Sequence, residues 1–315
     1  MDSTPRVACV VLNWNSYDDT ANCLDSLLDV SYDNLDLILV DNGSTDGSGE
    51  RLAESFPEVT TILNETNLGF GAGMNIGIER ALDRGADYVV ITNNDIVVEN
   101  RELFSRLAGV MERSEEIGML TPTVMEWPDT ETVWFEQGYV DERSGNASHM
   151  QSHHSLPNLR FDPEIGDTSP FAEDGLLPND YVPLCFAVIR AEVFDEIGLL
   201  PEDYFMYYED IEFATKMRNH GYRIATDTES EVYHRVSGSS GGDQSPLAEY
   251  YTVRNRLLLV RRGSTYGLPA YLIYAWWVWV KFAYYVITRR WASLKALSLG
   301  AYDGLRGQSG QGRYP

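Results

Sequence analysis

The first 113 residues alternate short, β-rich apolar runs with longer helical patterns. The apolar runs cover residues 7–12, 35–40, 59–63 and 88–92, and the helical patterns cover 17–28, 48–56, 71–84 and 102–113. Strands that alternate with helices predict a parallel sheet that is covered on both faces. We therefore predict an α/β fold with a mostly parallel sheet and flanking helices, in which ligands bind beyond the carboxyl ends of the strands.

The alternation of strands and helices stops between residues 126 and 180. This stretch is polar and contains several prolines, and it predicts loops with a hairpin-like piece at Trp134 and Phe135 around Gly138. A shorter α/β part then returns, with an apolar run over 181–189 and a helical pattern over 211–220. We expect this second part to extend the sheet.

Charge is unevenly distributed along the 315 residues. The formal net charge is −24, but the segment from Arg254 onward carries +9, which leaves −33 on the preceding part. An acidic body repels nucleic acid, so we expect no nucleic-acid partner, and its dispersed carboxylates are typical of a salt-adapted, haloarchaeal source. Three widely separated cysteines and an N-terminus without signal character predict a cytoplasmic location.

Five motifs occur at the predicted strand ends and at one helix start. They are Val10-Val11-Leu12-Asn13-Trp14-Asn15-Ser16, residues 39–48 around Asp41-Asn42-Gly43, the glycine-rich residues 67–75, Asn93-Asn94-Asp95, and Tyr208-Glu209-Asp210. In order and spacing they resemble the inverting family 2 glycosyltransferases of the GT-A fold, in particular the rhamnosyltransferase-like branch. The resemblance covers about residues 6–240.

The resemblance implies a nucleotide site in the first half of the chain. It places Asp41 on the nucleotide base, and a carboxylate at a strand end can accept a hydrogen bond from an imide N–H. The other nucleotide-binding residues that we predict are Asn13, Asn15, Asn67, Gly69, Asn75 and Asn94. Two structural alternatives stay open: a helix-capping turn over residues 41–48, and tight helix packing at Gly69, Gly71 and Gly73.

Asn93-Asn94-Asp95 stands where relatives of this family carry a metal motif with one or two acids. Asp95 is the residue of this motif that can bring full charge to Mn²⁺ or Mg²⁺, and bound diphosphate and water would supply further oxygens. His234 matches a position that adds a metal ligand in some relatives. The alternatives are an Asx turn at residues 93–95 and a histidine with only a structural role at 234.

Glu209 and Asp210 are the predicted catalytic residues. We assign Asp210 as the general base that deprotonates the acceptor, and Glu209 as a residue that orients the site or contacts the acceptor. The alternative interpretation is an acidic first helical turn, which the helix dipole favours.

The tail predicts contact with a membrane. Residues 268–288 form an apolar and aromatic segment that is interrupted only by Lys281, and Arg289, Arg290 and Lys295 follow it. The segment is suited to a membrane span or to a helix in the interface next to anionic lipid, and a buried core helix remains an alternative. We expect the protein at the cytoplasmic face of the cell membrane, peripheral or with a single span.

These inferences give a domain division and a function. We predict a GT-A domain over residues 1–250, with a nucleotide-binding half (1–115) and an acceptor and catalytic half (116–250), followed by membrane-associated helices in 251–315. The predicted reaction moves a sugar from a nucleotide-diphosphate sugar to a lipid-linked or other glycan acceptor in cell-surface glycan or protein N-glycosylation pathways. The alternatives are a non-catalytic sugar-nucleotide-binding scaffold and a nucleotidylyltransferase, although the glycine-rich phosphate loop of the latter is not found near the N-terminus.

Overall fold

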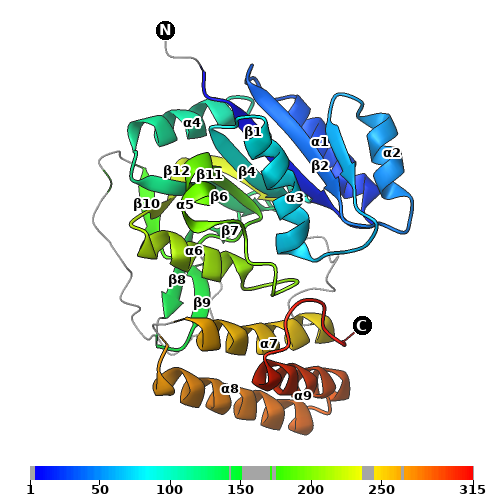
Figure 1. Ribbon diagram of the computed structural model, residues 1–315, viewed down its shortest axis with the longest axis vertical. Helices are drawn as coiled ribbons and strands as arrows, with labels where there is room; N and C mark the ends of the chain where they lie inside the picture. Colours follow the sequence, from blue (N-terminus) through cyan, green and yellow to red (C-terminus); the bar gives the residue numbers. More distant parts are fainter. Residues whose placement is uncertain are drawn as a thin grey trace.

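The protein is described from a computed structural model that covers residues 4–141, 143–150, 171, 175–235, 245–263 and 266–314 (Figure 1). The predicted alternation is confirmed in the first half. Its elements are β1 (Val7–Asn13), α1 (Tyr17–Leu28), β2 (Leu35–Asp41), α2 (Ser48–Ser55), β3 (Thr60–Leu63), α3 (Phe70–Asp83), β4 (Tyr88–Asn93), β5 (Ile96–Val97) and α4 (Leu103–Arg113).

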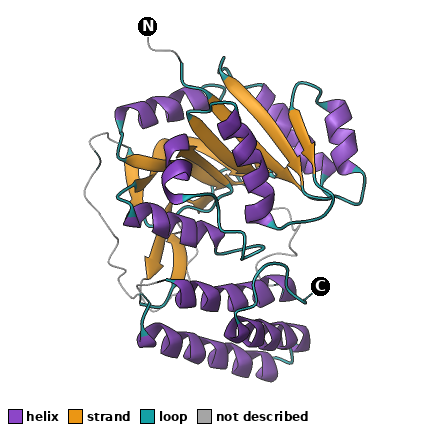
Figure 2. Ribbon diagram, viewed as in Figure 1, coloured by secondary structure: helices purple, strands orange, loops and turns teal. Residues whose placement is uncertain are grey.

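The strands β1 to β4 are parallel to their neighbours. β1 lies between β2 and β4, and β3 pairs with the far edge of β2. The central strands β1 and β4 are buried along almost their whole length because helices cover both faces of the sheet (Figure 2). Their carboxyl ends therefore meet at one edge of the sheet.

The second half turns the sheet into a mixed one. It contributes β6 (Ile117–Glu126), β10 (Leu176–Asn179), β11 (Phe186–Arg190) and β12 (Arg223–His234), and the main path of the described sheet reads β10-β12-β6-β11-β4-β1-β2-β3. β11 runs antiparallel to both β4 and β6, and β12 runs parallel to β6. The prediction of a mostly parallel sheet thus holds for the first half, while β10 and β11 are antiparallel additions.

A small hairpin lies within the stretch predicted to be loop-rich. β7 (Val133–Phe135) pairs with β6, and β8 (Gln137–Asp141) pairs with β9 (Asn146–Met150). The predicted hairpin around Gly138 is therefore wrong in its pairing, because Trp134 and Phe135 join the main sheet. Residues 151–170 and 172–174 of this stretch lie outside the described residues.

Five helices follow β11 in the part of the chain that the structure describes. α5 (Ala191–Ile197) and α6 (Glu209–Asn219) pack near the sheet, whereas α7 (Pro246–Arg262), α8 (Leu268–Ile287) and α9 (Trp291–Arg306) form a layer at one end of the molecule (Figure 1). The predicted domain boundary at 250/251 falls inside α7. Leu258 and Leu259 of this helix belong to the main hydrophobic core, so the first helix of the predicted tail packs in part with the sheet domain.

Candidate active site

Several of the predicted site residues lie at the carboxyl edge of the sheet. Asn13 ends β1, Asp41 ends β2, Asn93 ends β4 and His234 ends β12. β11 is antiparallel to both β4 and β6, so β4, β6 and β12 run in one direction. Their ends consequently lie on the same edge as those of β1 and β2, where an α/β sheet binds its ligands.

A hydrogen-bond network joins Asp41 to the end of β4. Asn13 Nδ2 donates to Asp41 Oδ1 at 2.6 Å, Thr20 Oγ1 donates to Asn13 Oδ1 at 2.7 Å, and Asn94 Nδ2 donates to Thr20 Oγ1 at 2.8 Å. Ser44 donates to Asp41 through both its backbone N–H and its hydroxyl group. These contacts hold the nearly buried Asp41 carboxylate in one orientation. The helix-capping turn over residues 41–48 is compatible with a contact between Asp41 and a nucleotide base, and that contact stays a prediction.

Asn15 joins the loop after β1 to the loop after β2 through hydrogen bonds. Its backbone N–H donates to Ser44 Oγ at 2.8 Å, and its Oδ1 accepts from Thr45 N at 2.8 Å. Its φ of 51° is left-handed, a region in which asparagine is tolerated. The residue is exposed and lies beside the Asp41 network, so it is placed to meet a ligand there.

Three glycines of the glycine-rich loop are packed closely against other parts of the protein. A Cβ at Gly69 would lie 2.5 Å from Phe205 O, one at Gly71 would lie 2.5 Å from Pro201 O, and one at Gly73 would contact Asn42 and Leu12. Tight packing, the alternative given by the sequence, therefore accounts for these three glycines. A backbone contact between Gly69 and a nucleotide is not tested by this geometry and stays a prediction.

Asn67 and Asn75 use their side chains within the protein. Asn67 Oδ1 accepts from Gly69 N at 2.9 Å and from Asn42 Nδ2 at 3.1 Å. Asn75 is buried, donates to Leu200 O at 3.0 Å and accepts from Leu200 N at 3.0 Å. Both residues hold loops of the site in place, and their predicted contacts with a nucleotide remain predictions.

Asp95 and His234 are brought together, as the metal prediction requires. His234 Nε2 lies 3.2 Å from Asp95 Oδ1, and each side chain is 9% exposed. β5 pairs with β12 and sets this approach, and Trp134 packs edge-on against the imidazole at 4.6 Å between ring centroids. His234 Nδ1 is buried and makes no hydrogen bond within the described part of the chain.

The Asp95–His234 pair fits two neighbouring ligands of one divalent cation. Adjacent ligands of an octahedral ion with metal–ligand distances of about 2.1 Å lie about 3.0 Å apart, which is close to the observed separation. Among the described residues, no group of three or more histidine, cysteine or acidic side chains could hold a metal ion by itself. A cation at this pair would therefore need oxygens from a bound ligand or from water.

Glu209 and Asp210 begin α6. Glu209 is buried and Asp210 is half-buried. Burial raises the pKa of both carboxyl groups, and the neighbouring Asp210 charge raises the pKa of Glu209 further. The pair therefore takes up its first proton at a higher pH than an isolated carboxyl group, and the family position assigns Asp210 as the proton acceptor.

The metal pair and the acidic pair belong to one site. Burial raises the pKa of Cys185, and the charges of the Asp95 and Asp210 carboxylates raise it further, so both act on this thiol within electrostatic range. Cys185 O accepts a hydrogen bond from Asn93 N at 2.9 Å, at the end of β4. The cation ligands and the predicted base therefore face the same region at the carboxyl edge of the sheet.

Comparison with known proteins decides the family. A profile of "Glycosyl transferase family 2" matches residues 8–172, just over half of the chain. The protein belongs to glycosyl transferase family 2. The predicted enzyme class is confirmed by this match, and the match covers four of the five motifs.

Two relatives and one solved structure are similar to this glycosyltransferase over most of their own length. The low-salt glycan biosynthesis hexosyltransferase Agl10 of Haloferax volcanii is 24% identical over 80% of this chain and 74% of its own. The N-acetylglucosaminyl-diphospho-decaprenol L-rhamnosyltransferase of Mycobacterium tuberculosis is 25% identical over 74% of this chain and 77% of its own. A solved mannosyltransferase from Pyrobaculum calidifontis, in complex with GDP-Man and Mn²⁺, has a TM-score of 0.58 at 18% identity and covers 96% of this chain, 88% of its own. This likeness confirms the GT-A fold.

Sequence reasoning missed two polar residues of this glycosyltransferase's site. Asn42 is buried; its Nδ2 donates to Gly69 O at 3.0 Å and its Oδ1 accepts from Leu68 N at 3.1 Å, so it joins β2 to the glycine-rich loop. Thr20 links Asn13 to Asn94. The position of Asn42 directly after Asp41 is a signal that could have identified it, whereas Thr20 lies in a helix without a local signal.

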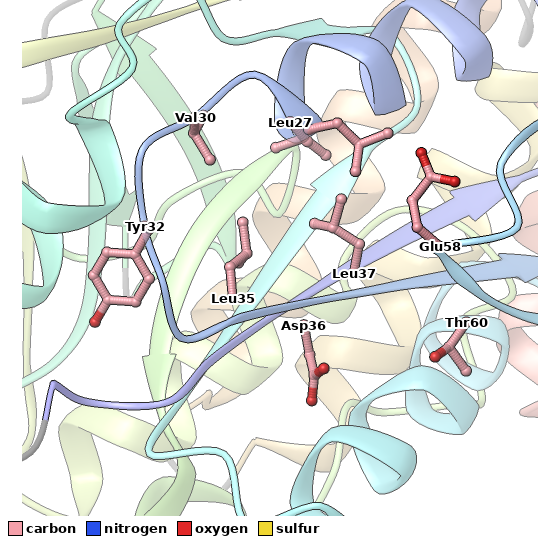
Figure 3. Close-up of a pocket in the computed structure, with 9 residues that line it drawn as sticks. Leu27, Val30, Tyr32, Leu35, Asp36, Leu37, Glu58 and Thr60 are labelled. Carbon is pink, nitrogen blue, oxygen red and sulfur yellow. The ribbon is translucent and has the colours of Figure 1, made fainter.

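A pocket of about 270 Å³ lies at the other end of the sheet (Figure 3). It is lined by Leu35 and Leu37 at the start of β2 and by residues of the loop after α1, including Val30 and Tyr32. The amino end of β2 is far from Asp41 at its carboxyl end. This pocket therefore has no part in the glycosyltransferase site.

Proposed function

We propose that the enzyme transfers a sugar from a nucleotide-diphosphate sugar to an acceptor hydroxyl with inversion, and that it requires a divalent cation. The observation that carries the proposal is the Asp95–His234 pair, 3.2 Å apart, at the same sheet edge as Asp41. The solved mannosyltransferase of the same fold, in complex with GDP-Man and Mn²⁺, supports a nucleotide sugar and a cation as ligands here. Whether Mn²⁺ or Mg²⁺ serves here is open to measurement.

The residues then have separate tasks. Asp41 and Asn13 hold the nucleotide. Asp210 takes the proton of the acceptor hydroxyl group while the oxygen of that hydroxyl group bonds to C1 of the sugar. The bond from C1 to the diphosphate oxygen breaks at the same time, and the nucleoside diphosphate leaves on the opposite face. A divalent cation held by Asp95 and His234 would neutralise the charge that develops on this leaving group.

A lipid-linked acceptor is the substrate class that we propose. The name of the mycobacterial relative includes a diphospho-decaprenol carrier. In the present protein, α8 is long and apolar enough to cross a membrane, and only 17% of its apolar window is buried. This exposure favours lipid contact over the buried-helix alternative, and an exposed apolar helix beside the catalytic domain supports a substrate that resides in lipid.

A screen of the purified protein tests the reaction. UDP-, GDP- and dTDP-sugars are incubated with Mn²⁺, with Mg²⁺ or with a chelator, and the released nucleotide is identified. We expect cation-dependent release of a nucleoside diphosphate. A scaffold protein would bind the nucleotide sugar without releasing a product, and a nucleotidylyltransferase would release pyrophosphate.

The pH dependence of turnover should report Asp210. Its pKa is raised by burial, and only its deprotonated form can accept a proton, so kcat should be full above this pKa and fall below it. We expect the acid limb of the kcat profile to lie above the usual aspartate range near 4. Metal is kept saturating so that a change in cation binding does not contribute, and a rate that stays level down to pH 4 would contradict the assignment.

Membrane contact should depend on the exposed face of α8. Leu272, Trp276 and Trp279 are 62%, 65% and 59% exposed, and each side chain contributes about 1.5–3 kcal/mol when it is fully buried in an apolar phase. We expect the triple change to serine to lower binding to anionic vesicles at least tenfold in flotation, with nucleotide-sugar binding unchanged. Leu28→Ser, at an exposed position on α1, is the control, and unchanged flotation of the triple variant would refute lipid contact.

Only part of the tail charge is available to lipid. Arg254 and Arg256 are buried, Lys281 pairs with Glu249 at 2.6 Å, Arg262 pairs with Asp203, and Arg313 pairs with the buried Asp303. The other exposed cations of the described tail are Arg261, which donates to Gly304 O and Leu305 O, and Arg289, Arg290, Lys295 and Arg306. We therefore expect apolar contact by α8 to contribute more than the +9 charge suggests.

A further inference from the structure

The loop in front of the catalytic acids has an unusual backbone. Phe205, Tyr207 and Tyr208 have φ values of 66°, 66° and 80°, and none of them is glycine. A left-handed conformation costs an ordinary residue about 1–2 kcal/mol. Three such residues within four positions persist only when surrounding contacts hold them, and the next residue of the chain is Glu209.

Helix α7 supplies contacts to this loop. Asn255 Nδ2 lies 3.0 Å from Tyr204 O, 2.7 Å from Met206 O and 2.9 Å from Tyr207 O. Its two N–H groups are thus shared among three carbonyl oxygens of the loop. The side chain of Asn255 is completely buried, so water does not compete for these bonds.

Arg254 fixes the orientation of the Asn255 amide group. Its Nε donates to Asn255 Oδ1 at 2.9 Å, which makes the oxygen face the guanidinium and the amide nitrogen face the loop. Its Nη2 donates to Tyr204 O and its Nη1 to Gly310 O, each at 2.7 Å. Arg254 is also fully buried. The C-terminal segment contacts the residue before this loop segment as well, because Gly310 N donates to Asp203 O.

The opposite side of the loop is held by the glycine-rich segment. Phe70 N, at the start of α3, donates to Phe205 O at 2.6 Å, and Gly69 leaves room for this close approach. The loop is therefore bonded between α3, which belongs to the nucleotide-binding half, and α7, which the sequence assigned largely to the tail. A shift of either helix would move the start of α6 and its two acids.

We propose that Asn255, oriented by Arg254, is a positioning residue that sets the place of Asp210 for the transfer reaction. This inference rests on the proposed function. It makes α7 and the C-terminal segment a part of the catalytic machinery as well as the support of the apolar helix α8. The two residues act through the loop backbone and do not touch the reacting atoms.

The variant Asn255→Ala tests the proposal, and Leu257→Ala is its control. Leu257 is buried on the same helix and packs with Val253, Tyr274 and Leu297, so its truncation destabilises α7 without removing a bond to the loop. We expect Asn255→Ala to lower kcat roughly 10–100-fold, as misplacement of a catalytic group by about 1 Å does, with the donor dissociation constant changed less than about twofold. Amide hydrogen exchange at residues 205–210 should become faster in this variant only.

The outcomes separate the possible explanations. Equal losses of kcat and equal exchange in the two variants would overturn the proposal, because they would report a general loss of stability. If the wild-type protein showed no transfer at all, the proposed function would fail, and the exchange of residues 205–210 would still decide whether Asn255 holds the loop. If Asn255→Ala does not fold, Arg254→Lys, which keeps the charge but removes the Nε donor, serves in its place with the same two readouts.

Discussion

Replacing Asp210 by asparagine should lower kcat by at least about 10²-fold, the lower end of the contribution of general base catalysis. The amide cannot accept the proton of an acceptor hydroxyl, whereas its shape and its bond to Ile211 N, in which Oδ1 accepts at 2.8 Å, can be kept. Binding of the nucleotide sugar should be retained, because Asp41 and Asp95 are unchanged. Product formation with a hydroxyl acceptor and calorimetric titration of the donor measure the two effects.

The matched control for this change is Asp195→Asn, an exposed acid-to-amide change on α5. It should leave both turnover and donor binding close to wild type. Glu209→Gln distinguishes the two neighbouring acids, because we expect a smaller loss of kcat from a residue that orients the site or contacts the acceptor. Near-normal transfer by Asp210→Asn would refute its role as the base, provided that the acceptor nucleophile is a hydroxyl group and not an ionised phosphate.

The alternating half of the fold could be read from the sequence because its signals are local. The helix predicted over 17–28 has the observed bounds, and the one predicted over 71–84 begins and ends one residue earlier in the structure. β6 and β12 could not be read in this way. β12 contains five polar residues in the run Thr226-Asp227-Thr228-Glu229-Ser230, and its pairing with β6 joins segments about a hundred residues apart.

The residues of the site likewise divide into those that local sequence signals identify and those that they do not. Asn13, Asp41 and Asp95 follow strand-like runs, so their position at the edge was predictable from topology. The resemblance implied that His234 adds a metal ligand; the structure places it 3.2 Å from Asp95, and the metal role of the pair stays a prediction. Nothing in the local sequence around Asn255 indicates the loop that it bonds, because its partners lie 48–51 positions earlier in the chain.

The second large effect that we expect is the loss of metal-supported turnover in Asp95→Ala. This change removes the carboxylate of the Asp95–His234 pair and leaves one imidazole to hold the cation. Affinity for Mn²⁺ in the presence of nucleoside diphosphate should fall by more than the roughly 10–100-fold that follows the loss of an outer-shell partner. Isothermal titration of Mn²⁺ measures the affinity, and cation-dependent release of nucleoside diphosphate measures the turnover.

Three further variants decide whether a damaged cation site causes the loss of turnover in Asp95→Ala. Asp83→Ala removes an exposed acid at the end of α3 and should change neither affinity nor turnover, so it controls for the loss of one negative charge. His234→Ala should weaken the same cation affinity, because the imidazole lies 3.2 Å from the carboxylate. Asn93→Asp should preserve or strengthen it, since it adds an acid to the motif. Unchanged Mn²⁺ affinity in Asp95→Ala would remove this residue from the metal site, and the short contact with His234 would then be only a structural bond between β5 and β12.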